Sequence, residues 1–178
     1  TMKENPGYEE LEKRTISLEV EQLDWKLREG SLKEKEARYR TLFESARDAI
    51  FMMKTDRFVE CNQQTLKVFG CTPDQILNKS PLSFSPQFQP DGSDSVTKAH
   101  EKIQLALDGQ SQFFEWRHIR CDGTPFDAEG SLNRVQLSDD TYLQCIVRDV
   151  TDRKRAEAAM RGYARRLTAL FNFVPYPM

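Results

Sequence analysis

The fold of this chain is decided at residues 149–157, which read Asp-Val-Thr-Asp-Arg-Lys-Arg-Ala-Glu. Residues 142–147 before this stretch are rich in β-branched and apolar side chains, which predicts a strand. Residues 153–171 after it are helix formers without proline. Asp149 or Thr151 can cap that helix with a side-chain oxygen. The sequence therefore predicts a strand that passes directly into a helix across a charged junction.

Composition divides the 178 residues into zones. Residues 8–41 are dense in Glu, Lys, Arg and Leu, which predicts a long N-terminal helix. Residues 42–150 hold most of the aromatic side chains and all four cysteines, as a globular domain would. Residues 151–171 return to a charged, alanine-rich helix. We therefore expect one domain between two helical arms.

Several classes of protein are disfavoured by composition. The net charge of -2 provides no basic field that would attract nucleic acid. No apolar run approaches the roughly 20 residues that span a bilayer, and no signal peptide is visible. The cysteines and the two histidines show no zinc-type spacing, and enzyme motifs such as a phosphate-binding glycine loop are missing. We expect a cytoplasmic protein that is not itself an enzyme, with free thiols, no nucleic-acid partner and no membrane insertion.

The N-terminal arm carries two apolar stripes. One set recurs at 4-3-4 spacing: Ile16, Val20, Leu23 and Leu27. The other set recurs every seven residues: Leu11, Leu18, Trp25, Leu32 and Tyr39. At about 100° per residue these sets fall on opposite helix faces. We predict that residues 8–41 form a parallel homodimeric coiled coil with the seven-residue set as its seam. The alternative is a helix that folds back on its own domain.

The globular zone shows regular punctuation. Asn62 can cap a helix that ends at Gly70, and Asp122-Gly123 is typical of a hairpin turn. We predict helices at 63–69, 73–77 and 94–107 and a loop at 78–93. The predicted strands are 49–54, 58–61, 111–120, 125–136 and 141–149. This order predicts an α+β domain with an antiparallel sheet and helices on one face.

Six short stretches resemble the PAS family of sensory domains. They lie at residues 48–50, 59–62, 69–74, 114–118, 121–124 and 149–157. The resemblance implies the PAS fold, a five-stranded antiparallel sheet, for residues 42–150. The Pro- and Phe-rich loop at 84–92 is similar to a subgroup of bacterial signalling proteins, the diguanylate cyclases and two-component histidine kinases. The residues at 168–178 resemble those at 40–50, so residues 172–178 are interpreted as the start of a truncated second PAS domain.

The resemblance implies a non-catalytic sensory and dimerisation module. Such a module binds a small ligand or a partner. It relays the signal through Asp149, Thr151 and Arg153 to a downstream output domain that is absent from this chain. No cofactor is expected, or only a small organic ligand. The alternatives are a ligand-free spacer that sets dimer register and a haem-binding gas or redox sensor.

Strand alternation predicts the ligand pocket. Phe126 and Ala128 share one face of their strand, and Leu143, Cys145 and Val147 share a face of the next. Flavin-binding relatives place a ligand-contacting side chain five residues before the hairpin glycine, which here is His118. The complete set of candidates is Ile50, Met52, Leu66, Phe69, Phe84, Ile103, Phe114, Trp116, His118, Phe126, Ala128, Leu143, Cys145 and Val147.

Two histidines are weighed separately. His118 is polar on an apolar wall, so it is either a core histidine with one internal hydrogen bond or a group that orients a ligand. His100 lies on the long helix where haem-binding relatives carry their iron ligand, and it is a weak haem candidate. The neighbouring Lys98, Glu101 and Lys102 favour a surface histidine instead. The cysteine motif of light-sensing flavin relatives is absent.

Overall fold

The computed structural model describes residues 6–172, which form two compact units that divide between Ser45 and Ala46. The first unit is the helix α1 (Pro6–Ser45), which runs for 40 residues without a break through Gly30. Ion pairs one turn apart, such as Arg28 with Asp24 at 2.7 Å, run along its exposed surface. The predicted long N-terminal helix is thus confirmed, while the coiled coil stays a prediction.

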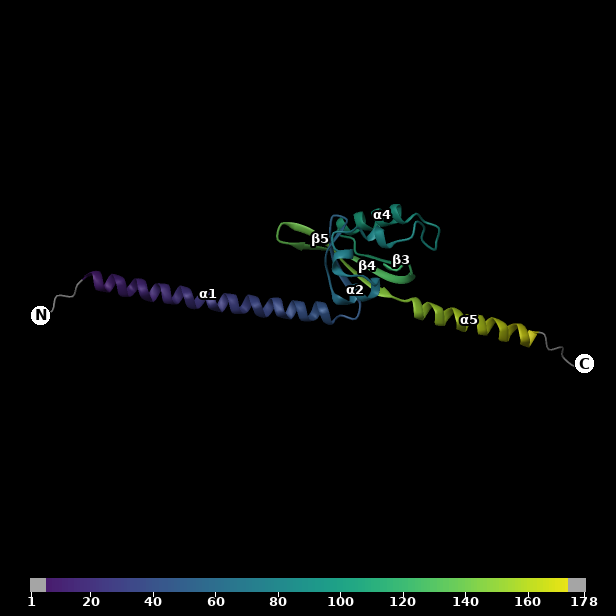
Figure 1. The fold of residues 1–178 in the computed structure, drawn as a ribbon, viewed down its shortest axis with the longest axis horizontal. Coiled ribbons are helices and arrows are strands. Elements are labelled where there is room, and N and C mark those ends of the chain that lie inside the picture. Colours follow the sequence, from purple (N-terminus) through teal and green to yellow (C-terminus); the bar gives the residue numbers. More distant parts are fainter. Residues whose placement is uncertain (1–5, 173–178) are drawn as a thin grey trace, which may run out of the picture. The chain divides into compact units, whose positions relative to one another are not determined.

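The second unit is a five-stranded sheet with helices on one face (Figure 1). Neighbouring strands are all antiparallel, in the order β2-β1-β5-β4-β3. The predicted α+β fold is confirmed. In chain order the elements are β1 (Ala49–Lys54), β2 (Arg57–Cys61), α2 (Gln63–Phe69), α3 (Pro73–Ile76), η1 (Pro81–Phe84), α4 (Ser95–Leu107), β3 (Gln112–Ile119), β4 (Pro125–Leu137), β5 (Asp140–Asp149) and α5 (Thr151–Asn172).

Local side-chain chemistry sets the predicted helix ends. Asn62 caps α2 by accepting a hydrogen bond from the Thr65 backbone at 2.9 Å. Gly70 ends the same helix in the left-handed conformation, with φ 63°. The predicted loop at 78–93 contains one turn of 3-10 helix, η1. Pro81 supplies the φ angle that this turn requires, and Ser80 caps it.

The core lies between the inner face of the sheet and the short helices. Ring centroids 4.5 to 6.4 Å apart connect five phenylalanines from β1, β2, α2, η1 and β4: Phe51, Phe58, Phe69, Phe84 and Phe126. Such contacts between tilted rings stabilise a core beyond the burial of their area. The described helices include none that is long and apolar enough to cross a membrane. The predicted second domain at 172–178 lies outside the described residues, except for Asn172.

Candidate functional site

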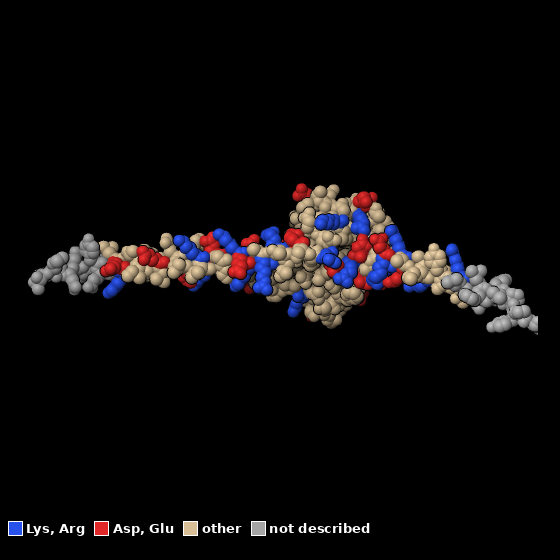
Figure 2. Space-filling view, turned by 90° about the horizontal axis from the view of Figure 1, so that it is seen from below, with Lys and Arg blue, Asp and Glu red and all other residues tan. Residues whose placement is uncertain are grey.

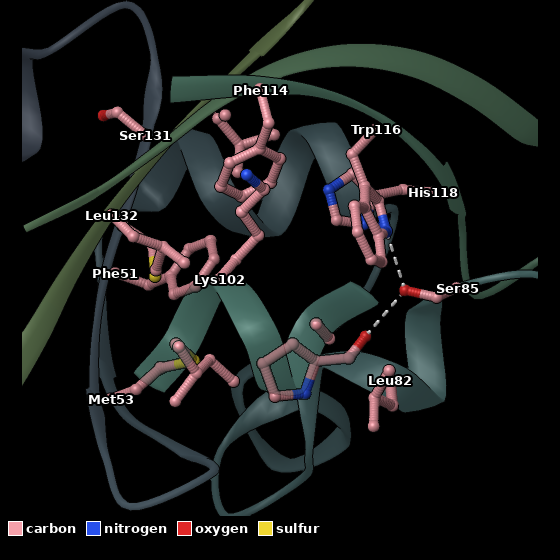
Figure 3. A pocket seen from close by; sticks show the side chains of 16 residues that line it. Phe51, Met53, Leu82, Ser85, Lys102, Phe114, Trp116, His118, Ser131 and Leu132 are labelled. Atoms are coloured by element: carbon pink, nitrogen blue, oxygen red, sulfur yellow. Dashed lines mark hydrogen bonds between the residues drawn. The ribbon is translucent and has the colours of Figure 1, made fainter. Parts of the chain in front are cut away.

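A cavity of about 60 Å³ lies between the sheet and the layer formed by η1 and α4 (Figure 3). Its helix-side wall consists of Pro81, Leu82, Ser85, Ala99, Lys102 and Ile103. Its sheet-side wall consists of Phe51, Met53, Phe114, Trp116, His118, Gly130, Ser131, Leu132, Cys145 and Val147. A buried water needs about 10–15 Å³ of such space, so the cavity has room for about four to six water-sized groups.

Six of the fourteen predicted pocket residues line the cavity: Ile103, Phe114, Trp116, His118, Cys145 and Val147. Another six belong to the core or pack against it without reaching the cavity: Leu66, Phe69, Phe84, Phe126, Ala128 and Leu143. Figure 3 shows Phe114, Trp116 and His118 from β3 gathered at one side of the cavity. The adjacent residue Phe113 points to the other face of β3 and is 74 % exposed. This agrees with the inward orientation of His118 that the resemblance to flavin-binding relatives favoured.

The prediction of Ile50 and Met52 was wrong about the face of β1. Phe51 and Met53 line the cavity, and alternating side chains of a strand point to opposite faces. Ile50 and Met52 therefore point away from it. Residues 49–53 are apolar throughout, so no polar side chain marked the outer face.

Strand alternation placed Gly130 on the inward face of its strand, but Gly130 was not among the predicted pocket residues. Gly130 lies opposite Phe114 in the β3–β4 register. A Cβ atom placed at Gly130 would be 3.1 Å from Cε2 of the Phe114 ring. Absence of a side chain therefore lets the aromatic ring lie against the strand. The strand register, had it been known, would have identified this pair.

His118 makes the internal hydrogen bond expected of a core histidine, whereas a role in orienting a ligand stays a prediction. Its Nδ1 atom lies 3.3 Å from the Phe84 carbonyl oxygen. Because a carbonyl only accepts, Nδ1 carries the hydrogen and Nε2 is an acceptor. Nε2 makes no hydrogen bond to the described residues. Among these residues every fully buried side-chain nitrogen or oxygen has a partner, so Nε2 is not fully buried. Nε2 is therefore open to the cavity. Burial lowers the pKa of His118 from 6.5 to about 4, so the imidazole is neutral at pH 7.

Hydrogen bonds from β3 hold the cavity's outer wall in place. Trp116 donates from Nε1 to the Ser85 hydroxyl at 3.0 Å, and that hydroxyl donates to the Pro81 carbonyl at 3.3 Å (Figure 3). The buried side chain of Gln89 accepts from the Arg117 backbone at 2.7 Å. The loop between η1 and α4 is thus fastened to the sheet at several points, which gives the cavity a fixed shape.

The weak haem candidate lies elsewhere. His100 is exposed on α4 and is not among the residues that line the cavity. The described residues contain no group of three or more His, Cys, Asp or Glu side chains that could hold a metal ion. These residues do not fit a haem site.

The predicted relay residues lie together where β5 passes into α5. Asp149 accepts from the Thr151 backbone at 2.9 Å and pairs with Arg120 at 2.5 Å. The Thr151 hydroxyl accepts from the Asp127 backbone in β4 at 3.0 Å, so it joins the helix to the sheet and does not cap it. Arg153 pairs with Glu129 of β4.

The charges at this junction are balanced. Figure 2 shows acidic and basic side chains close together at the domain end of α5. Burial, the largest single influence, raises the pKa of Asp149. Hydrogen bonds from Thr151 and the ion pair with Arg120 together outweigh it, so the net pKa is lowered. Asp149 is therefore ionised at neutral pH, as its contacts require.

Fold and cavity define a class of protein: a small α+β domain with a cavity between an antiparallel sheet and its covering helices. The chain belongs to the PAS domain family, which matches residues 47–152. This match confirms the resemblance that the sequence motifs carried. The family and a sensor-named relative indicate that the chain is a non-catalytic sensory module.

This chain is similar to three named proteins. It is 28% identical over 142 residues to the methyl sulfide methyltransferase-associated sensor of Methanosarcina acetivorans. That alignment covers 79% of this chain and 14% of the relative, so the chain spans about a seventh of that protein. The PAS domain of an HTR-like protein from Haloarcula marismortui is 27% identical, with a TM-score of 0.56, over 70% of this chain and 98% of that one.

A second solved structure comes from a protein with a kinase name. It is a domain of the sensory box sensor histidine kinase/response regulator of Geobacter sulfurreducens. It is 25% identical, with a TM-score of 0.54, over 66% of this chain and 96% of that one. Both solved relatives are matched over nearly their whole length, which supports the domain's fold as a self-contained unit.

Proposed function

We propose that this PAS domain senses a small, uncharged and mainly apolar molecule with one hydrogen-bond donor, bound in the cavity beside His118. The observation that carries the proposal is the neutral Nε2 acceptor on a mainly apolar wall. A neutral imidazole gives no charge attraction to an anion, and the mainly apolar lining disfavours ions. The charged lining residue, Lys102, donates from its ammonium group to Gln112 at 3.3 Å. The cavity volume limits the ligand to about four to six non-hydrogen atoms.

Binding is tested with a panel of short alcohols and the corresponding alkanes, measured by thermal shift and calorimetry. We expect the alcohols to stabilise the protein and to bind more tightly than the alkanes. Ala99→Leu fills the cavity from α4, so it should abolish the shift. Ala158→Leu places the same change on an exposed position of α5 and should leave the shift intact.

The second candidate is a ligand-free spacer. The five mutually packed phenylalanines favour it, because they already fill most of the core. If no member of the panel shifts the melting temperature, and Ala99→Leu stabilises the protein by filling empty space, the spacer is the better reading.

Output is proposed to leave through α5. The contacts of Asp149, Thr151 and Arg153 connect the first turn of α5 to β3 and β4, which also line the cavity. A ligand that favours one arrangement of β3 would therefore bias the helix start. The downstream domain, of diguanylate cyclase or histidine kinase type, belongs to this proposal, as do the cytoplasmic location and the domain limits 8–41, 42–150 and 151–171.

Dimerisation through α1 completes the proposal. The seam residues Leu11, Leu18, Trp25, Leu32 and Tyr39 are 49 to 66 % exposed in the single chain. Leu18 and Leu23 provide a matched pair, because they are similarly exposed on different faces of α1. Leu18→Gln should shift the mass measured by light scattering towards the monomer, and removal of residues 1–35 should do so completely. If only Leu23→Gln shifts the measured mass towards the monomer, the seam lies on the face of α1 that carries Leu23.

A further inference from the structure

Three thiols from separate elements come together outside the lining of the cavity. Cys61 ends β2, Cys71 follows α2, and Cys121 lies in the hairpin between β3 and β4. The Cys121 backbone donates to the Phe69 carbonyl at 2.9 Å, which brings the hairpin against the end of α2. The Cys71 backbone donates to the Leu66 carbonyl of the same helix at 3.0 Å, so both cysteines are anchored to the last turn of α2, and the Cys121 thiol is close enough to raise the pKa of Cys71. None of these residues lines the cavity.

The two thiols of this pair differ in environment. Cys121 is exposed, whereas Cys71 is half-buried. Burial first, and then the neighbouring Cys121, raises the pKa of the Cys71 thiol to about 12. Cys71 therefore stays protonated and is a poor first nucleophile, while Cys121 is accessible to an oxidant. Cys145, the fourth cysteine, is buried on the cavity wall, and burial raises the pKa of its thiol as well.

We propose that Cys71 and Cys121 are a peroxide-oxidisable pair that forms a reversible intramolecular disulfide. The Cys121 sulfur attacks one oxygen of the peroxide, the O–O bond breaks, and one water and a Cys121 sulfenic acid result. The Cys71 sulfur then attacks the Cys121 sulfur and the S–O bond breaks. The oxygen leaves as a second water after taking up the thiol proton. Two thiols and one hydrogen peroxide become one disulfide and two waters.

The pair is placed next to the proposed relay. Arg120, the neighbour of Cys121, donates to the Val68 carbonyl at the end of α2 and to Asp149 at the start of α5. A bond between Cys71 and Cys121 ties together the two segments that Arg120 bridges. Oxidation should therefore change the freedom of the α5 start. The disulfide itself is independent of the proposed ligand and relay, and only this consequence rests on them.

The disulfide is tested by treating the reduced full chain with equimolar hydrogen peroxide and mapping the products by mass spectrometry. We expect loss of two hydrogen atoms, a peptide pair joining Cys71 to Cys121, and full reversal by a thiol reductant. In Cys71→Ser, a dimedone-trapped sulfenic acid should accumulate on Cys121. Cys61→Ser should still form the disulfide, whereas Cys121→Ser should form neither product.

Contrary outcomes are equally clear. Stepwise oxygen addition to Cys121 in the wild type, with no loss of hydrogen, would overturn the proposal. A bond that maps to Cys61 or that joins two chains would also overturn it. Hydrogen exchange at residues 150–154, compared between reduced and oxidised protein, tests the link to α5. Unchanged exchange in the oxidised protein would overturn that link, whatever the alcohol panel reports on the cavity.

Discussion

Two helices begin directly after a strand, α2 after β2 and α5 after β5, and a polar side chain organises each start. At α2 the side chain is Asn62, which is neutral and fully buried. Its oxygen accepts from the backbones of Ile50 and Thr65, and its nitrogen donates to the Asp48 carbonyl. At α5 it is Asp149, which is charged and 27 % exposed at its side chain. The buried group secures the local fold, whereas the exposed group makes contacts that can be exchanged for water.

The difference follows from desolvation. A buried hydrogen-bonding group that loses its partner finds no water, so each loss costs about 1–3 kcal/mol. An exposed ion pair exchanges with solvent at little cost. Asn62 keeps the sheet and α2 together, whereas the exchangeable contacts of Asp149 suit the response of α5 in the proposed relay.

The largest effect is expected at Asn62. Asn62→Ala removes the partners of two backbone N–H groups and one carbonyl, so we expect a loss of about 3–5 kcal/mol in the free energy of unfolding. Lys67→Ala, at an exposed position of the same helix, is the control and should change little. Chemical denaturation measures both. A loss below about 1 kcal/mol would mean that the contacts of Asn62, like those of an exposed ion pair, are replaced by water at little cost.

The second effect is a pH dependence from His118. Above pH 6.5 the imidazole is neutral in both folded and unfolded chains. Below it, only the unfolded chain takes up a proton, because the folded pKa is about 4. Stability should therefore fall by about 3 kcal/mol between pH 6.5 and 4.

The groups around His118 support this assignment. Its ring is surrounded by the rings of Phe69, Trp116 and Phe126, and the charged Lys102 shares the cavity wall. His118→Phe should remove most of the slope between pH 6.5 and 5, where carboxylates contribute little. An unchanged slope in this variant would assign the pH dependence to other groups.

A smaller effect is expected at Asp149. Asp149→Ala should cost about 1 kcal/mol, as the loss of one cap does. Typical allosteric couplings are about 1–3 kcal/mol, so output of the longer parent protein should change while the domain stays folded. Asp152→Ala, an acid in the same turn that is fully exposed, is the matched control. Melting temperature and output activity are measured together. Collapsed stability with unchanged output would make Asp149 structural.

The sign of the pH dependence separates Asp149 from His118. The folded pKa of Asp149 is lowered, so its contribution is present above the unfolded pKa near 3.9 and is lost as pH falls through that region. The difference between wild type and Asp149→Ala should therefore shrink in acid. It should remain constant between pH 8 and 6, well above the range in which Asp149 titrates.

The smallest effect concerns the ion pair of Lys154 with Glu115, which are 2.5 Å apart. A double-mutant cycle with alanine should give about 0.2–1 kcal/mol, because solvent still reaches both side chains, which are 32 % exposed at Lys154 and 66 % at Glu115. Added salt should reduce this coupling further. A coupling that exceeds that of Asp149 with Arg120 would reverse the ranking of contacts at the α5 start.

Much of the fold could be predicted because its signals are local. The Asn62 cap, the left-handed Gly70 and the Asp122-Gly123 turn depend only on residues close to them in the sequence. Each could therefore be predicted from the sequence alone.

Alternation in β4 and β5 was readable because polar side chains mark much of the outer face. In β3, Phe113 and Ile119 left open which face points inward. The resemblance to flavin-binding relatives favoured Phe114, Trp116 and His118. Strands β3 and β5 supplied most of the predicted residues that line the cavity.

Only the tertiary structure decided the rest. β1 is apolar on both faces, so packing alone placed Phe51 and Met53 on the cavity and Ile50 and Met52 away from it. The contact of Arg120 with Asp149 joins residues 29 positions apart, and neither residue signals its partner. The cysteines of the thiol pair are even further apart in sequence, because 50 positions separate Cys71 from Cys121. Local sequence sets backbone conformation over a few residues, whereas long-range pairs depend on how completed strands and helices pack.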